Sequence, residues 1–427
     1  MEKHVSKYLT MHLENNKLLH PNQHGFRKKY NTQSALTQVC DFIHNNLILN
    51  NYVVSIFIDL KKAFDTLDPE KIIITLHNIG VRGKFLQWFK NYVKDRRFTV
   101  KIGKEFGYLF STERGVPQGS VLGPTLFNIY VNEILKTLEN VIYVAYADDM
   151  VILIAGRELQ RLLELAQAEM DKFVKWAHDN NLTINCNKTK YMLCRTGHMG
   201  QETKKNLQIH SCYCFTLNNP DNCSCDEIER VDSYKYLGVH IDCKLLWDEQ
   251  ILNLRKKLKI FLFQFSYLQN LIPTETKKIL YYGLVESTIR YGVISWGTAS
   301  KTKSKQLQKI QRHIVEKILP FRVVFQLSKK NDIFQRTGIL PLQALSDYCI
   351  ARNEEAFKHH LVNTPREELA RGCRRYIVPM ANNRHGEQTM AHLVPTVLNK
   401  IPQKILRTKN KTKLREYFLE NIDRFQN

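Results

Sequence analysis

Two adjacent carboxylates between two apolar runs constrain the fold of this chain more than any other feature. Asp148 and Asp149 follow the apolar run 141–145 and precede the apolar run 150–155. Two short apolar runs separated by a few polar residues predict a β-hairpin, which here would carry the acids at its tip. Aspartates are also ordinary turn residues, so this pattern alone is more typical of a solvated turn.

A second acid at the end of an apolar strand favours a metal site over a solvated turn. The run 53–58 is rich in β-branched and aromatic residues and ends at Asp59, after which the pattern becomes helical. A carboxylate at the end of a buried strand costs free energy unless a cation faces it. Together, Asp59, Asp148 and Asp149 would form an all-oxygen site of the kind that Mg²⁺ prefers. Such sites catalyse phosphoryl and nucleotidyl transfer with two metal ions.

The charge balance predicts a polyanionic partner. The 427 residues include 63 Lys and Arg against 41 Asp and Glu, which gives a formal net charge of +22, and the basic residues are spread along the chain. Nucleic acid is therefore a more natural partner than a membrane surface, and charge that only keeps the protein soluble is the alternative. No apolar run approaches the ~20 residues that span a bilayer, and no signal peptide opens the chain. We expect an intracellular protein of the nucleus, the cytoplasm or both.

The order of the predicted elements indicates two or three subdomains. Residues 1–50 have mostly helical patterns, and strands then alternate with helices to about residue 195 in a mixed α/β arrangement. Helices are predicted over residues 69–79, 84–94 and 159–178, a strand pattern runs over 234–242, and residues 197–230 have the composition of a loop or insertion. Beyond residue 243 the pattern is helical and basic, with a first helical segment ending at Pro320.

A dense Gly and Pro run lies between the two acidic strand ends. In residues 115–124 the glycines permit close approach of a ligand to the backbone, and Gln118 can hydrogen-bond to it. Six characteristic stretches follow one another along the chain: residues 22–27, 58–65, 115–124, 146–149, 182–189 and 236–242. With these stretches in this order, the chain resembles the reverse transcriptases of non-LTR retrotransposons, and most closely those of the jockey-like LINE group. The resemblance extends from residue 1 to about residue 320.

The resemblance implies a right-hand polymerase of the α/β class with an α+β palm. Residues 1–242 would form the fingers and palm, residues 243–320 a helical thumb, and residues 321–427 a helical, basic C-terminal region. The implied activity is that of an RNA-directed DNA polymerase, which extends the 3′-hydroxyl of a DNA primer with dNTPs on an RNA template. No membrane partner and no particular protein partner are implied.

The resemblance also implies a two-metal mechanism with Mg²⁺, for which Mn²⁺ could substitute. Asp59 and Asp148 would each ligate both ions, and Asp149 would support the ion that binds the primer end. The backbone carbonyl of Leu60 would be a further ligand. One ion would lower the pKa of the primer hydroxyl, and the other would stabilise the departing pyrophosphate.

Further roles around the nucleotide are implied by matching positions. Phe64 matches an aromatic steric gate against the 2′-hydroxyl, with an ordinary core aromatic as the alternative. Gln118 and Gly119 would line the nucleotide pocket, and Arg27 could meet the triphosphate.

Two more roles concern the leaving group and the primer. Lys188 is the candidate proton donor to pyrophosphate, and Lys190 is close enough in sequence to compete for that role. Tyr236, Leu237 and Gly238 resemble the primer grip, for which a plain hairpin in the core is the alternative.

The match also has departures that leave other functions open. The chain begins within what should be the fingers, so we expect part of the nucleotide-binding surface to be missing, and no endonuclease or RNase H pattern is present. One alternative is a truncated element remnant that binds nucleic acid without catalysis. The other is an RNA-dependent RNA polymerase, which Phe64 and the Gly and Pro run disfavour.

Four cysteines form two C-x-C pairs within residues 197–230. If a hairpin brought Cys212, Cys214, Cys223 and Cys225 to one face, four sulfurs could hold a tetrahedral zinc ion. Reduced cysteines in a loop are the alternative.

Overall fold

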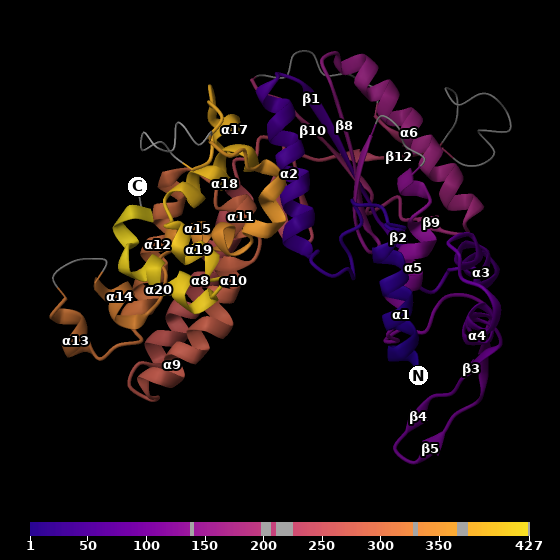
Figure 1. Ribbon diagram of the computed structural model, residues 1–427, viewed down its shortest axis with the longest axis horizontal. Coiled ribbons are helices and arrows are strands. Elements are labelled where there is room, and N and C mark those ends of the chain that lie inside the picture. Colours follow the sequence, from indigo (N-terminus) through magenta and orange to yellow (C-terminus); the bar gives the residue numbers. More distant parts are fainter. Residues whose placement is uncertain (137–140, 198–205, 211–224, 328–331, 365–374, 426–427) are drawn as a thin grey trace. The chain divides into compact units, whose positions relative to one another are not determined.

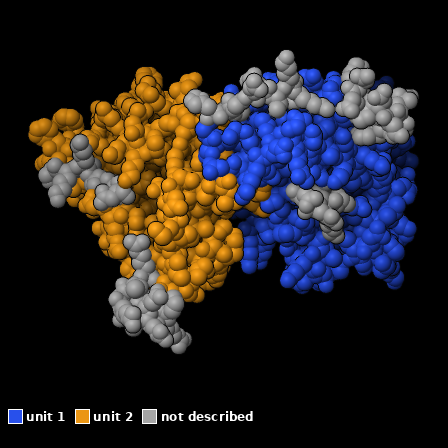
Figure 2. All heavy atoms as spheres, turned by 90° about the horizontal axis from the view of Figure 1, so that it is seen from above, with its two compact units in different colours: residues 1–35, 50–232 blue, residues 36–49, 233–427 orange. Residues whose placement is uncertain are grey.

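The chain divides into two compact units. The computed structural model describes residues 1–136, 141–197, 206–210, 225–327, 332–364 and 375–425. Figure 2 colours the two units separately: unit 1 contains residues 1–35 and 50–232, and unit 2 contains residues 36–49 and 233–427. None of the described helices is long and apolar enough to cross a membrane.

A five-stranded sheet is the centre of unit 1 (Figure 1). Its order is β13-β10-β1-β8-β7, in which β1 lies antiparallel to both β10 and β8, and only β13 is parallel to its neighbour. The strands are β1 (Tyr52–Ile58), β7 (Ile142–Tyr146), β8 (Asp149–Gly156), β10 (Lys190–Cys194) and β13 (Glu229–Arg230). β1 can occupy the central position because every residue after Tyr52 is buried and most of them are β-branched or aromatic.

Among the described residues of unit 1, short strands form four two-stranded ladders in addition to the main sheet. β2 pairs with β9, β3 with β6, β4 with β5, and β11 with β12. Their bounds are β2 (Leu60–Lys61), β3 (Arg96–Phe98), β4 (Lys101–Ile102), β5 (Glu105–Phe106), β6 (Phe110–Thr112), β9 (Thr183–Ile184), β11 (Gln208–Ile209) and β12 (Asp226–Glu227).

The helices predicted over residues 69–79, 84–94 and 159–178 are present in unit 1, and α5 (Gly123–Val131) is an additional helix. The described helices of unit 1 are α1 (Glu2–Asn15), α3 (Pro69–Asn78), α4 (Gly83–Val93), α5, the 3₁₀ turn η1 (Ile134–Lys136) and α6 (Leu159–Asp179), while α2 (Thr32–Ile48) continues into unit 2. α3 begins where the sequence predicts, because the Asp68 side chain accepts a hydrogen bond from Glu70 N and a proline fixes the first helical position.

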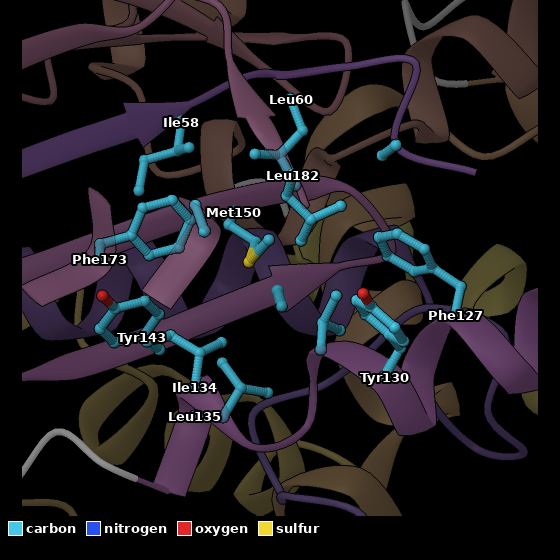
Figure 3. Packing of buried hydrophobic residues seen from close by; sticks show 14 of the residues in the cluster. Ile58, Leu60, Phe127, Tyr130, Ile134, Leu135, Tyr143, Met150, Phe173 and Leu182 are labelled. Atoms are coloured by element: carbon cyan, nitrogen blue, oxygen red, sulfur yellow. The ribbon is translucent and has the colours of Figure 1, made fainter. Parts of the chain in front are cut away.

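One face of the main sheet packs against helices α5 and α6 to form the core. Ile58 and Met150 are paired across β1 and β8, and they contribute to one cluster with Phe127 of α5 and Phe173 of α6 (Figure 3). Each of these four side chains is at most 3% exposed. Burying a side chain of this size stabilises the fold by about 1.5–3 kcal/mol, so the cluster fixes β1 and β8 in register.

Unit 2 combines a hairpin with many helices. The hairpin consists of β14 (Ser233–Tyr236) and β15 (Val239–Asp242), and β15 packs against helix α8. The remaining elements are α8 (Asp248–Leu268), α9 (Thr274–Leu280), the π-helix η3 (Tyr281–Glu286), α10 (Ser287–Arg290), α11 (Val293–Trp296), α12 (Lys301–Glu316), α13 (Phe321–Phe325), α14 (Asp332–Thr337), α15 (Leu342–Arg352), η4 (Glu354–His360), α17 (Arg384–Glu387), α18 (Met390–Asn399), α19 (Gln403–Arg407), α20 (Lys411–Glu420) and η5 (Ile422–Phe425).

The unit boundary differs from the predicted boundary at residue 242. The β14–β15 hairpin belongs to unit 2, because Gln250 of α8 accepts a hydrogen bond from the backbone N–H of His240 and Asp242 accepts hydrogen bonds from the backbone that leads into α8. The hairpin itself is present as the sequence predicts. The division into fingers, palm and thumb stays a prediction.

Candidate active site

The three predicted acids lie at one edge of the main sheet. Ile58 pairs with Met150, so Asp59 and Asp149 are the next residues along the same antiparallel register. Tyr146 pairs with Asp149, which leaves Asp148 in a two-residue hairpin turn. Because side chains alternate along strands, Asp59 and Asp149 are placed on the sheet face opposite to that of Ile58 and Met150. Asp59 and Asp149 are therefore directed away from the core that α5 and α6 cover.

The three carboxylates repel one another. The pKa of Asp149 is raised to about 6, first because partial burial removes water from the carboxylate and then because Asp148 and Asp59 add negative charge nearby. The pKa of Asp148 is also raised, by partial burial and by the charge of Asp59, although a hydrogen bond from its own backbone acts in the opposite direction. A cation bound here would favour the charged forms.

The acids fit a divalent cation by their chemistry. Carboxylate oxygens are the hard ligands that Mg²⁺ and Mn²⁺ take in proteins. Partial burial, and after it the negative charge of neighbouring carboxylates, raises the pKa values of Asp148 and Asp149. Within the described part of the chain, no three His, Cys, Asp or Glu side chains are already gathered as a ligand set.

Asp59 is held by the loop that follows β9. Asn185 makes two contacts with it: Nδ2 donates to Asp59 Oδ2 at 2.9 Å, and the backbone N–H donates to the Asp59 carbonyl at 2.8 Å. The Asp59 N–H donates to Thr189 Oγ1 at 3.4 Å. Neither Asn185 nor Thr189 was assigned a role from the sequence, although both lie in a stretch that resembles the family. Hydrogen-bonding residues around a ligand side chain restrict its orientation.

Lys188 and Lys190 have different surroundings. Lys188 Nζ lies 3.9 Å from Asp59 Oδ2, and its side chain is 69% exposed. Lys190 Nζ forms an ion pair with Glu229 at 2.6 Å across the edge of the sheet. This arrangement favours Lys188 over Lys190 as the proton donor, and that role stays a prediction.

Residues 22–24 form an unpredicted support beside the acidic turn. Ala145 N donates to the Asn22 carbonyl at 2.9 Å, and His24 N donates to the Ala145 carbonyl at 2.7 Å, so the segment pairs in parallel with β7. Between them the fully buried Gln23 accepts a hydrogen bond from Ala147 N at 3.2 Å. Ala147 has φ +56, a conformation that costs a non-glycine residue about 1 kcal/mol or more. The Gln23 bond helps to hold that strained turn.

Gly25 packs directly against the same turn. A Cβ atom at this position would lie 2.4 Å from Ala147 N, and Asn128 Nδ2 of α5 fixes the glycine by donating to its carbonyl at 2.7 Å. The signal that could have found Gln23 and Gly25 is their place in the first family-like stretch. The partner of that stretch could not be predicted, because it is about 120 residues away.

Phe64 is the centre of a small aromatic group. Its ring stacks on Phe127 with centroids 4.5 Å apart and meets Phe26 edge-on at 6.5 Å. Phe26 has φ +55, is 54% exposed, and also lies 6.5 Å from the Tyr146 ring. Phe64 is half-buried, so it is anchored on one side by the core while part of its ring remains accessible.

The Gly and Pro run folds back onto the segment after Asp59. Gly115 has φ +79, and a Cβ there would lie 2.7 Å from the Asp65 carbonyl oxygen, so only glycine fits. Gln118 is exposed, and its Nε2 donates to Asp65 Oδ1 at 2.8 Å. Gly119 has φ +80 with open space around its Cβ position. Gln118 and Gly119 are thus placed next to the segment that carries Phe64, and their contact with a nucleotide stays a prediction.

Arg27 is held by contacts within the protein. Its side chain is 7% exposed and makes a bidentate pair with Glu14 of α1, with two N–O distances of 2.9 Å. Its remaining nitrogen donates to the carbonyls of His20 and Gln23 at 2.7 and 3.2 Å. Four of the five guanidinium N–H groups are used in this way, so at most one N–H group of Nη2 is left for a triphosphate, and that role stays a prediction. In this arrangement Arg27 fixes the support segment to α1.

The residues that resemble a primer grip form a tight turn in unit 2. Leu237 and Gly238 both have positive φ, at 45° and 79°, as expected for the favoured two-residue hairpin turn. The Tyr291 hydroxyl donates to the Leu237 carbonyl at 2.7 Å, and the Tyr236 side chain is buried. The other predicted site residues belong to unit 1.

The proposed zinc cluster cannot be placed. Cys212, Cys214 and Cys223 lie outside the described residues, and Cys225 is half-buried beside β12.

Comparisons with known proteins place this site in a family. A family model described as "Reverse transcriptase (RNA-dependent DNA polymerase)" matches residues 1–241. The chain is 25% identical over 308 residues to the RNA-directed DNA polymerase from mobile element jockey of Drosophila melanogaster, covering 69% of this chain and 31% of that protein. The corresponding protein of Drosophila funebris is 26% identical over 306 residues, with the same coverage. The chain thus spans about a third of the length of the curated relatives it matches.

Solved structures show a weaker similarity. Telomerase from Candida albicans in complex with the TWJ fragment of telomeric RNA matches with a TM-score of 0.42 and 11% identity. The match covers 84% of this chain and 55% of the telomerase chain.

Proposed function

The chain belongs to the reverse transcriptase (RNA-dependent DNA polymerase) family, and from that premise we propose that it copies RNA into DNA for a non-LTR retrotransposon of the jockey type. The substrates would be an RNA template, a DNA primer and dNTPs. The observation that carries this proposal is the meeting of Asp59, Asp148 and Asp149 at one sheet edge, where the pKa values of Asp148 and Asp149 are raised. The sheet of unit 1 would be the palm, and helices of unit 2 after residue 243 would be the thumb.

Divalent metal ions are the cofactors that this family uses. We propose that two Mg²⁺ ions, or Mn²⁺ as a substitute, bind Asp59, Asp148 and Asp149, with the backbone carbonyl of Leu60 as a further ligand. When bound, such ions lower the pKa of the primer 3′-hydroxyl and stabilise the negative charge that develops on the phosphates.

The residues around the acids would position them for this chemistry. Asn185 orients one oxygen of Asp59, and Gln23 and Gly25 hold the turn that carries Asp148. Lys188, exposed and near Asp59, would protonate the departing pyrophosphate.

Substrate selection would come from the aromatic group. The Phe64 ring, fixed by its stack on Phe127, would occupy the volume of a 2′-hydroxyl and cannot hydrogen-bond to it. Deoxynucleotides would therefore be favoured over ribonucleotides. The reaction on nucleic acid would take place in the nucleus, the cytoplasm or both.

Primer extension tests this proposal. The purified chain should extend a DNA primer on an RNA template with Mg²⁺ and dNTPs, and Asp148→Ala should abolish extension while primer-template binding is kept. A folded, unmutated chain that binds primer-template without any synthesis would instead indicate a nucleic-acid-binding remnant. Preference for ribonucleotides would indicate an RNA-dependent RNA polymerase.

A further inference from the structure

One hairpin of unit 1 carries a series of solvent-exposed apolar side chains. Residues 97–111, which include most of the β3–β6 and β4–β5 ladders, are all exposed. Figure 1 shows the ribbon of β4 and β5 extending beyond α1 and α4 of the same unit. Seven large hydrophobic residues there are at least 50% exposed: Phe98, Val100, Ile102, Phe106, Tyr108, Leu109 and Phe110. A two-stranded hairpin is only marginally stable in water, and an apolar surface of this extent indicates a binding site.

Basic side chains are interleaved with the exposed rings. Phe98 lies opposite Phe110, and their rings stack with centroids 5.5 Å apart. Lys101 lies opposite Phe106, and its Nζ is 5.0 Å from the ring centroid. Residues 97–111 contain three basic residues, Arg97, Lys101 and Lys104, and one acidic residue, Glu105. The segment therefore carries a net charge of +2. Flat rings beside cationic side chains provide stacking for bases and contacts for phosphates.

The base of the hairpin is fixed to the candidate active site. Arg96 Nη2 donates to the carbonyls of Arg114 and Gly115, at 2.6 and 2.8 Å. Gly115 N in turn donates to the Leu67 carbonyl at 2.7 Å, within the segment that follows Asp59. The exposed hairpin is therefore an extension of the Gly and Pro run, held in place relative to the residues that would contact the nucleotide.

We propose that the hairpin of residues 97–111 binds single-stranded RNA, with bases stacked on its rings and phosphates contacted by its basic side chains. The choice of RNA rests on the proposed function, in which an RNA strand is the template. Lysine is depleted in the core of protein interfaces, whereas here Lys101 and Lys104 lie among the most exposed apolar residues. This charge complementarity favours a nucleic acid over a second protein surface.

Fluorescence anisotropy with a labelled, unstructured single-stranded RNA tests the proposal on the full chain, without dNTPs or metal. The double variant Phe106→Ala with Tyr108→Ala should bind at least about tenfold more weakly, because base stacking on each ring is lost. Replacing the same two residues by Trp should restore affinity. Ile74→Ala, on the exposed side of α3 and 56% exposed, is the matched control and should change nothing. Lys101→Gln with Lys104→Gln should reduce the slope of log affinity against log salt by about 1.4.

Several results would overturn the proposal. Unchanged RNA affinity in the Ala double variant would do so, as would a loss of affinity only for single-stranded DNA of the same sequence. Reduced self-association in sedimentation velocity with unchanged RNA affinity would assign the hairpin to a contact between copies of the chain. Because the binding assay requires no synthesis, it gives its answer even if the chain proves to have no polymerase activity.

Discussion

Replacing Gly25 by alanine should slow the polymerase without unfolding it. The added Cβ would lie 2.4 Å from Ala147 N and 3.1 Å from both Ala147 Cα and the Tyr146 carbonyl carbon. Real Cβ contacts essentially never fall below 3.0 Å, so the two segments must separate by at least 0.6 Å (3.0 − 2.4). All three close atoms are backbone, and therefore no side-chain rotation can relieve the clash. The turn that must move is the one that carries Asp148.

The size of the effect follows from that displacement. A misplacement of about 1 Å in a catalytic group can cost about 100-fold in rate, so we expect the rate constant for incorporation of one nucleotide to fall about 10- to 100-fold. Overpacking typically costs about 1–3 kcal/mol of folding free energy, which should leave the chain folded at room temperature. The assay is single-turnover incorporation with saturating primer-template, together with a thermal melt of each variant.

Gly156→Ala is the matched control at the other end of β8. Its Cβ would meet Leu162 side-chain atoms at 3.5 and 3.7 Å, which is ordinary contact, and the incorporation rate should stay close to that of the unmutated chain. A folded Gly25→Ala variant with a rate within threefold of the unmutated chain would refute the reasoning. So would an equal loss in both variants.

Four further predictions concern single side chains. Arg27→Ala should lower the free energy of unfolding by about 2 kcal/mol in urea melts, because the partly buried bidentate pair with Glu14 is broken. The KM for dNTPs should stay nearly unchanged, and a tenfold rise in KM would support the triphosphate role. The pKa of Asp149 is about 6 in the folded protein, whereas the ordinary value is 3.8. Between these two pH values the folded state binds more protons than the unfolded state, so the free energy of unfolding falls as the pH rises through this window. In chelator, Asp149→Asn should therefore raise the free energy of unfolding by about 1 kcal/mol at pH 8, after solvent screening, but not at pH 4. Equal free energies of unfolding at pH 8 would contradict this. Phe64→Val should reduce discrimination against ribonucleotides about 10- to 100-fold in competition assays, whereas an unchanged ratio would leave Phe64 as a core aromatic. Lys188→Ala should slow single-turnover incorporation about 100-fold and Lys190→Ala less than threefold, and the opposite order would exchange their roles.

The acidic edge of the sheet could be predicted because its signal is local. Each of the two strand patterns has a carboxylate at one end, and both patterns are local. The antiparallel pairing of 53–58 with 150–155, which leaves those ends side by side, is a distant contact that only the structure gives. The helices 69–79, 84–94 and 159–178 were predictable for the same reason, since their apolar spacing and the Asp68–Pro69 start are local features.

The support for that edge could not be predicted, because it depends on distant pairing. Nothing within residues 22–27 shows that Gln23 and Gly25 will lie against Ala147, and nothing in the motif shows that Arg27 will pair with Glu14. An arginine in a family-like stretch suggests phosphate binding, whereas the fold buries this one against a helix. The β3–β6 hairpin likewise has short, interrupted strands with no buried face, so no clear periodicity marks it.

Counting bound metal ions tests the central claim most directly. Electron paramagnetic resonance titration with Mn²⁺, in the presence of primer-template and a non-hydrolysable dNTP, should detect two ions per unmutated chain. Asp148→Asn should bind at most one ion with comparable affinity, because Asp148 is expected to ligate both. Equal numbers of tightly bound ions in the two proteins would contradict the assignment of Asp59, Asp148 and Asp149 as the metal site.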